Sequence, residues 1–182
     1  MRKLFSIGIA MMMMFTIFAG NHTAHAEDTE CRGAYGEVTL TGNLIVLDDA
    51  TCTLNGTNVQ GNITVKSRSM LDATNIQVTG GIQGESPRSI RISTSNIGNS
   101  VQVRKGGPLA GSPEVVAVDI EFSNVTGDIQ LEELVGFVSL VGNQVSGSIQ
   151  ANKNTGGVNI TDNIIGNGLQ CQDNNPTSNG RW

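Results

Sequence analysis

The sequence is poor in histidine and in aromatic side chains, and both shortages exclude familiar kinds of site. Its two histidines, His22 and His25, lie near the start of the chain, and its one tryptophan and one tyrosine are Trp182 and Tyr35. Without a histidine after residue 25, a Ser-His-Asp or Cys-His arrangement has no base, and a conventional zinc site lacks its usual nitrogen ligand. A sugar-binding cleft with aromatic platforms also finds few candidates.

The chain also lacks a basic surface and a long apolar segment. Residues 1–26 begin with Arg2 and Lys3, continue through a short apolar run and close on Ala24 and Ala26, which is the pattern of a secretory signal peptide. The apolar run is shorter than a membrane span requires. We therefore expect cleavage after Ala26 and a secreted extracellular, periplasmic or cell-surface domain with no membrane span. This domain keeps 9 of the 11 basic and all 16 acidic residues, a net charge of −7, which argues against nucleic-acid binding.

What the sequence does contain is a repeat of 19–20 residues. One aliphatic side chain recurs at intervals of 19, 19, 19, 28, 20 and 20 residues, at Leu44, Ile63, Ile82, Val101, Ile129, Ile149 and Leu169. Other apolar residues recur at fixed offsets from it. The template Φ-x-Φ-x4-Φ-x3-Φ-x-Φ, in which Φ is apolar, holds in six complete units.

The repeat predicts an all-β, single-domain parallel β-helix of about seven turns over residues 27–176. Each Φ-x-Φ pair predicts a short strand with one buried face, and the middle Φ predicts a third short strand or a corner. One turn cannot bury enough apolar surface to offset the cost of ordering its backbone, so the turns must stack. We expect a loop insertion at 104–117 and a polar tail at 177–182.

A glycine or asparagine follows the middle Φ in every unit. Because both residue types tolerate a left-handed backbone, we expect that conformation at this corner. The residues concerned are Gly61, Gly80, Asn99, Gly127, Gly147 and Asn167.

Repeated phrases give the chain a family resemblance. They are "GNLIV" (42–46), "GNITV" (61–65) and "GNGLQC" (166–171). The units resemble the right-handed parallel β-helix of the pectate-lyase-like group. More closely, they are similar to small exported bacterial proteins of unassigned function that carry "GNLxV" and "GNLQC" phrases. The resemblance covers 31–176 and implies the architecture and its right hand, but no activity.

Two columns of amide side chains are expected on the surface. We call the recurring aliphatic residue of each unit its anchor, and the residue after it is expected to point outward. From the second unit on, these outward residues are Thr64, Gln83, Gln102, Gln130, Gln150 and Gln170. The five glutamines are either a contact strip for sugar hydroxyls or another rod, or a structural amide ladder. A second column is interpreted as structural and contains Asn58, Gln77, Asn96, Asn124 and Gln144.

Acidic side chains offer one candidate catalytic cluster. Asp72, Arg91 and Asp119 are expected at the same outward position of successive turns. Two carboxylates beside an arginine could serve glycan cleavage, but alternating charges on neighbouring strands also pair as ordinary surface ions. Asp48-Asp49 and Glu132-Glu133 are interpreted as exposed turn residues rather than calcium ligands. We predict neither cofactor nor metal.

The position of each of the three cysteines in the repeat predicts its chemical state. Cys31 precedes Cys52 by 21 residues, about one turn, so we expect them to be vertical neighbours joined by a disulfide. Cys171 falls at an inward position and is expected to be a buried thiol.

These features favour an exported, non-enzymatic β-helix that acts as a surface, matrix, adhesion or glycan-contacting module. Its expected partners are extracellular polysaccharide or copies of itself. The alternative is a polysaccharide-active lyase or hydrolase of the pectate-lyase-like type. The shortage of aromatic side chains disfavours both the lyase and a conventional lectin.

Overall fold

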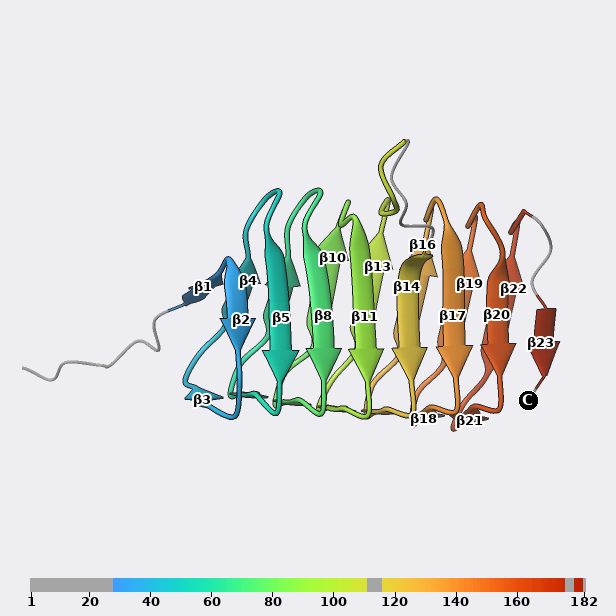
Figure 1. Cartoon of the computed structure of the whole chain (residues 1–182). Helices are drawn as coiled ribbons and strands as arrows, with labels where there is room; N and C mark the ends of the chain where they lie inside the picture. Colours follow the sequence, from blue (N-terminus) through green and yellow to red (C-terminus); the bar gives the residue numbers. More distant parts are fainter. Residues whose placement is uncertain (1–27, 111–115, 176–178, 182) are drawn as a thin grey trace, which may run out of the picture.

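Three parallel β-sheets wind into a solenoid of about seven turns (Figure 1). The computed structural model describes residues 28–110, 116–175 and 179–181. The expected signal peptide, residues 111–115 of the expected loop and Trp182 lie outside them. Within the described residues every regular element is a strand, and no helix that could cross a membrane is found. The all-β, parallel solenoid expected from the repeat is confirmed.

Each turn contributes one strand to each sheet. Sheet A contains β1 (Thr29–Cys31), β4 (Leu44–Val46), β7 (Ile63–Val65), β10 (Ile82–Glu85), β13 (Val101–Arg104), β16 (Ile129–Glu132), β19 (Ile149–Asn152) and β22 (Leu169–Gln172). Sheet B, which faces the viewer in Figure 1, contains β2 (Gly33–Tyr35), β5 (Thr51–Asn55), β8 (Met70–Thr74), β11 (Ser89–Ser93), β14 (Val116–Glu121), β17 (Phe137–Val141), β20 (Val158–Thr161) and β23 (Asn179–Arg181). Sheet C contains the two-residue strands β3 (Thr39–Leu40), β6 (Asn58–Val59), β9 (Gln77–Val78), β12 (Asn96–Ile97), β15 (Asn124–Val125), β18 (Gln144–Val145) and β21 (Ile164–Ile165).

The core is a set of vertical apolar columns inside the three sheets. In sheet A the anchors pair in register from Leu44 through Ile63 and Ile82 to Ile149, and each of them is fully buried. The template works because alternate residues of a strand point to opposite faces, so each Φ-x-Φ pair faces inward. The middle Φ forms sheet C, where Val59, Val78 and Ile97 stack in the same way.

The corner after sheet C is not left-handed at the glycines named for it, so that expectation is wrong; Gly42, at the same corner of the first turn, does have a left-handed φ of 104°. Gly61, Gly80, Gly127 and Gly147 are absent from the residues with positive φ. They are constrained by space instead: a Cβ on any of them would collide with the preceding turn. At Gly80 it would meet the Asn62 side-chain amide, with Cγ at 2.8 Å, and the Gly61 carbonyl oxygen at 2.8 Å.

Left-handed residues occupy the other two corners. One set follows the strands of sheet A: Asp49, Arg68, Ser86, Lys105, Glu133, Lys153 and Asp173. The other follows the strands of sheet B: Gly56, Asn75, Thr94, Phe122, Gly142 and Asp162. Most are not glycine, and each stands in a backbone region that costs ordinary residues about 1–2 kcal/mol. Stacking against the neighbouring turns compensates for this cost.

A buried polar ladder fastens the corner between sheets B and C. The Asn163 side chain accepts a hydrogen bond from the Asn143 backbone at 2.9 Å, and that of Asn143 accepts one from Ser123 at 3.0 Å. Ser123 Oγ in turn accepts one from the Ser95 backbone at 3.1 Å. Each side chain thereby satisfies an amide that the corner removes from the sheet ladders.

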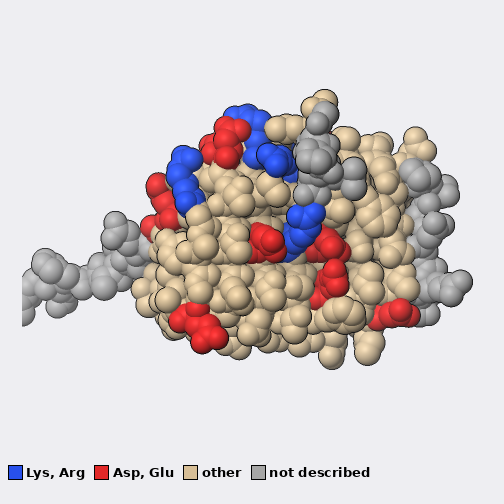
Figure 2. Space-filling view, in the orientation of Figure 1, with Lys and Arg blue, Asp and Glu red and all other residues tan. Residues whose placement is uncertain are grey.

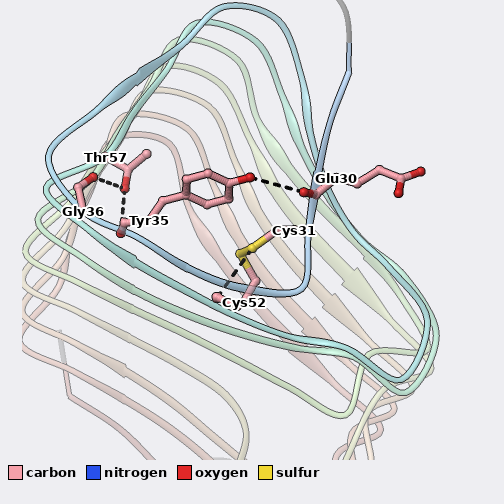
Figure 3. Close-up of a disulfide and its surroundings, with 7 residues drawn as sticks. Glu30, Cys31, Tyr35, Gly36, Cys52 and Thr57 are labelled. Carbon is pink, nitrogen blue, oxygen red and sulfur yellow. Dashed lines mark hydrogen bonds between the residues drawn. A yellow bond between two sulfur atoms is a disulfide. The ribbon is translucent and has the colours of Figure 1, made fainter.

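The Cys31–Cys52 disulfide is confirmed, but its placement differs from the expected vertical pair (Figure 3). Cys31 stands beside Val46 in sheet A, whereas Cys52 stands beside Gly33 in sheet B. The bridge therefore crosses the interior between two sheets at the N-terminal end. There the Tyr35 ring points across the first turn, and its hydroxyl donates to the Glu30 carbonyl at 3.3 Å.

The expectation that Cys171 is buried is wrong. It pairs in register with the buried Ala151, so its inward position is as expected. However, β22 is an edge strand of sheet A, and no described strand covers it. Cys171 is therefore a free, exposed cysteine at the C-terminal end of the solenoid.

The first residues of the insertion between β13 and β14 hydrogen-bond to the neighbouring turns of the solenoid. The Gly106 carbonyl accepts from the Val135 amide at 2.8 Å, and the Gly107 amide donates to the Pro87 carbonyl at 2.8 Å. Gly106 and Gly107 therefore lie between Pro87 of the preceding turn and Val135 of the following turn, before the chain leaves the stack.

Candidate functional site

The outer face of sheet A carries the glutamine column. Gln83, Gln102, Gln130, Gln150 and Gln170 pair in register on β10, β13, β16, β19 and β22. Thr64 continues the column on β7. Neighbouring strands of a sheet lie ~4.8 Å apart, so the amides form a regular row along the solenoid. Their role as a contact strip stays a prediction.

The glutamine amides do not bond to one another. Among the described residues, no hydrogen bond joins the side-chain amides of any two of the five. Sheet C differs, because the Asn124 amide donates to the Asn96 side-chain oxygen at 2.9 Å. An amide has two donors and an acceptor with two lone pairs, so the row on sheet A keeps its hydrogen-bonding capacity for a ligand.

A second row of side chains runs beside the glutamines on the same face. It is two residues further along each strand and alternates in charge through Lys66, Glu85, Arg104 and Glu132. Arg104 Nε lies 3.3 Å from Glu132 Oε2, and Lys105 Nζ lies 3.8 Å from Glu85 Oε1. Within each of these exposed pairs the positive and negative charges cancel, and such pairs add little to the stability of the fold.

Shallow grooves lie between the two rows. One has a volume of about 270 Å³ and is lined by Gln102, Gln130, Arg104 and Glu132. Another of about 220 Å³ is shared by neighbouring turns, with Lys66, Gln83, Glu85 and Gln102 among its lining residues. Amide, cationic and anionic groups therefore converge on hollows of nearly balanced charge.

The outer face of sheet B carries the predicted acidic cluster. Asp72, Arg91 and Asp119 pair in register on β8, β11 and β14. In Figure 2, acidic side chains flank a basic one near the middle of this face. The structure thus brings together all three residues that the repeat placed there.

Glu121 belongs to the same cluster, and the sequence reasoning missed it. The negative charge of Asp119 raises the pKa of the Glu121 carboxyl, and partial burial and a hydrogen bond with Asp119 raise it further. Glu121 stands two residues after Asp119 on one strand, so the same alternation that placed Asp119 could have revealed it.

Of the remaining acidic candidates, Asp48, Asp49 and Glu133 lie in exposed turns or bends, whereas Glu132 is the last residue of β16, so its interpretation as a turn residue is wrong. Two hydrogen bonds of 2.7 and 2.6 Å join the Arg68 guanidinium to the Asp49 carboxylate, and they lower the pKa of Asp49. No group of three metal-ligating side chains occurs in the described part of the chain.

No family model, curated protein or solved structure matches this chain.

Proposed function

We propose that this protein is an exported, non-enzymatic β-solenoid that contacts polysaccharide through the outer face of sheet A. The observation that carries the proposal is the row of five glutamines whose amides are in register and not bonded to one another. The "GNLIV" and "GNGLQC" phrases support a relation to small exported bacterial repeat proteins.

The spacing of the row suits an extended glycan. Rungs ~4.8 Å apart advance at about the pace of one pyranose unit in an extended chain. Each primary amide can donate to one sugar hydroxyl and accept from another. Because no aromatic side chain of the described residues lines the row, each sugar contact is weak, and affinity must accumulate over several rungs.

The charged row beside the glutamines limits the choice of polysaccharide. Its ion pairs nearly cancel, so the face offers no field that would attract a strongly charged polymer. We therefore expect neutral, unbranched glycans to bind better than polyuronates or sulfated chains.

Affinity electrophoresis through gels that contain neutral or acidic polysaccharides tests the proposal. The wild-type protein should be retarded by at least one neutral polymer, and the Gln102→Ala/Gln130→Ala variant should lose most of the retardation. The matched control is Gln77→Ala/Gln144→Ala, which removes two amides from sheet C and should migrate like the wild type. Equal loss in both variants would reject sheet A as the binding face.

One observation favours the enzymatic alternative. The negative charge of Asp119 raises the pKa of Glu121, and a raised pKa is a property useful in a general acid. The decisive test is a degradation panel of neutral and uronate polysaccharides, with and without calcium. Product formation that is lost in Glu121→Gln would replace the non-enzymatic proposal.

A further inference from the structure

The corner that leads into β22 differs from the corresponding corners of earlier turns. There the residue before each anchor of sheet A donates its backbone amide to a side-chain oxygen, usually one on the preceding turn. These bonds are Asn62 to Asn43 at 2.9 Å, Gly81 to Asn62 at 2.9 Å, Ser100 to Asn99 at 2.9 Å, Asp128 to Ser100 at 3.0 Å and Ser148 to Asp128 at 2.7 Å. Gly168 takes this position before Leu169, and no described residue accepts a hydrogen bond from its amide.

The side chain that precedes this amide is that of Asn167. Both Asn167 and Gly168 are exposed, and a Cβ on Gly168 would meet no atom within 4 Å beyond its chain neighbours. A backbone amide nitrogen can attack the carbonyl carbon of the preceding asparagine side chain, and glycine favours this because it has no Cβ to hinder the approach. The open corner therefore leaves the two reacting groups free to reach the required geometry.

The chain has three Asn-Gly pairs, and the structure holds them differently. At Asn55-Gly56 the Gly56 amide donates to the Thr74 carbonyl of the next turn at 3.0 Å, and the Glu37 side chain crowds Gly56. The third pair, 179–180, lies in β23, in register with β20. Asn55 is as exposed as Asn167, so what distinguishes the two is the hydrogen bond of the glycine amide.

We propose that Asn167 is a site of spontaneous deamidation. The Gly168 nitrogen loses its proton to solvent and forms a bond to the Asn167 Cγ, and the side-chain nitrogen leaves as ammonia. Water then opens the cyclic succinimide at either of its carbonyls, which gives aspartate or isoaspartate. The net reaction consumes a water molecule and releases ammonia, and it needs no oxidant or metal.

The reaction changes the last rung of sheet A. Either product places a new negative charge at the C-terminal end of the solenoid, and isoaspartate also adds a methylene to the backbone directly before Leu169. Leu169 and Gln170 are in register with Ile149 and Gln150, and β22 has no described strand on its other side to hold it there. Isoaspartate therefore shifts the last glutamine out of the row. The deamidation itself does not depend on polysaccharide binding.

Peptide mapping of the full chain tests the proposal. Samples are kept at mildly alkaline pH, digested and analysed by mass spectrometry, with fragment ions locating each conversion of an amide to a carboxyl. In the native protein Asn167 should convert at least about fivefold faster than Asn55, because the hydrogen bond of the Gly56 amide must break before its nitrogen can attack. In guanidinium chloride the two rates should agree within about twofold, because neither glycine amide is then held by the fold.

A glycine-to-alanine exchange tests the chemical step. Gly168→Ala should suppress the conversion and remove the isoaspartate detected at this position by isoaspartyl methyltransferase labelling. Alanine fits there, because the space is open and Gly168 does not have a left-handed φ. The matched control is Gly36→Ala, the same exchange at another open position, which should leave the rate at Asn167 unchanged.

Three results would overturn the proposal. Equal native rates at Asn55 and Asn167 would show that the hydrogen bond of the glycine amide does not matter. Conversion of Asn167 in guanidinium chloride but not in the native protein would show that the folded corner protects it. Conversion of Gly168→Ala at the wild-type rate would replace attack by the backbone nitrogen with direct hydrolysis. The first two comparisons use only the wild-type protein, so they decide the question even if the variant does not fold.

Discussion

Gly80 tests whether the corner after sheet C is governed by space or by backbone handedness. A Cβ at this position would collide with the Asn62 amide, whose oxygen accepts a hydrogen bond from the Gly81 backbone at 2.9 Å. Overpacking costs about 1–3 kcal/mol, and leaving the buried Gly81 amide unpaired costs about 1–3 kcal/mol more. Gly80→Ala should therefore lower the free energy of unfolding by about 2–6 kcal/mol, and the larger Gly80→Asn by at least as much.

The order of the two variants separates the explanations. At a left-handed corner asparagine is tolerated better than alanine, so Gly80→Asn would be the more stable protein. Gly56 is the matched control, because its φ is +70° and the three atoms nearest to an added Cβ all belong to the exposed, flexible Glu37 side chain. Since Asn75 occupies the same corner one turn later, Gly56→Asn should cost less than about 1 kcal/mol. Urea denaturation gives all three values, and Gly80→Asn proving more stable than Gly80→Ala would refute the steric account.

Three further predictions concern the cysteines and the acidic cluster. Replacing both Cys31 and Cys52 by alanine should cost about 3 kcal/mol by urea denaturation, because the bridge closes a loop with a sequence separation of 21; a change below about 1 kcal/mol would contradict this. Cys171 should react with a maleimide in the folded, unreduced protein at a rate near that of a free thiol, and protection until urea is added would contradict its exposure. NMR titration should find the pKa of Glu121 above that of an ordinary glutamate, and Asp119→Asn should lower it. A raised pKa stabilises the fold below the unfolded pKa of Glu121, and this contribution disappears as the pH rises through the folded value; no difference between the variants would contradict the assigned cause.

The stacking of the turns could be predicted because a single requirement repeats. Alternating apolar residues such as Ile129 and Leu131 must face inward on every turn, so their spacing gives the sheets and their register. The same alternation placed Asp72, Arg91 and Asp119 in one row. Sheet C, with strands of two residues, was foreseen only as a short strand or corner because one apolar residue carries little pattern.

What could not be predicted depends on how neighbouring turns and sheets contact one another in space. Glycine satisfies both a left-handed backbone and a close approach, so Gly80 in the sequence does not say which applies. The inward position of Cys171 was correct, but its burial requires a strand above β22. A spacing of 21 residues between Cys31 and Cys52 resembles one turn, yet the bridge joins different sheets.

The central claim is that the glutamine row of sheet A is the contact surface, and side-chain NMR tests it most directly. The amide signals of Gln102, Gln130 and Gln150 should shift when a neutral oligosaccharide from a retarding polymer is added. Those of Gln77 and Gln144 on sheet C should stay in place. Shifts confined to sheet C, or to the Asp119 and Glu121 carboxyls of sheet B, would contradict the account.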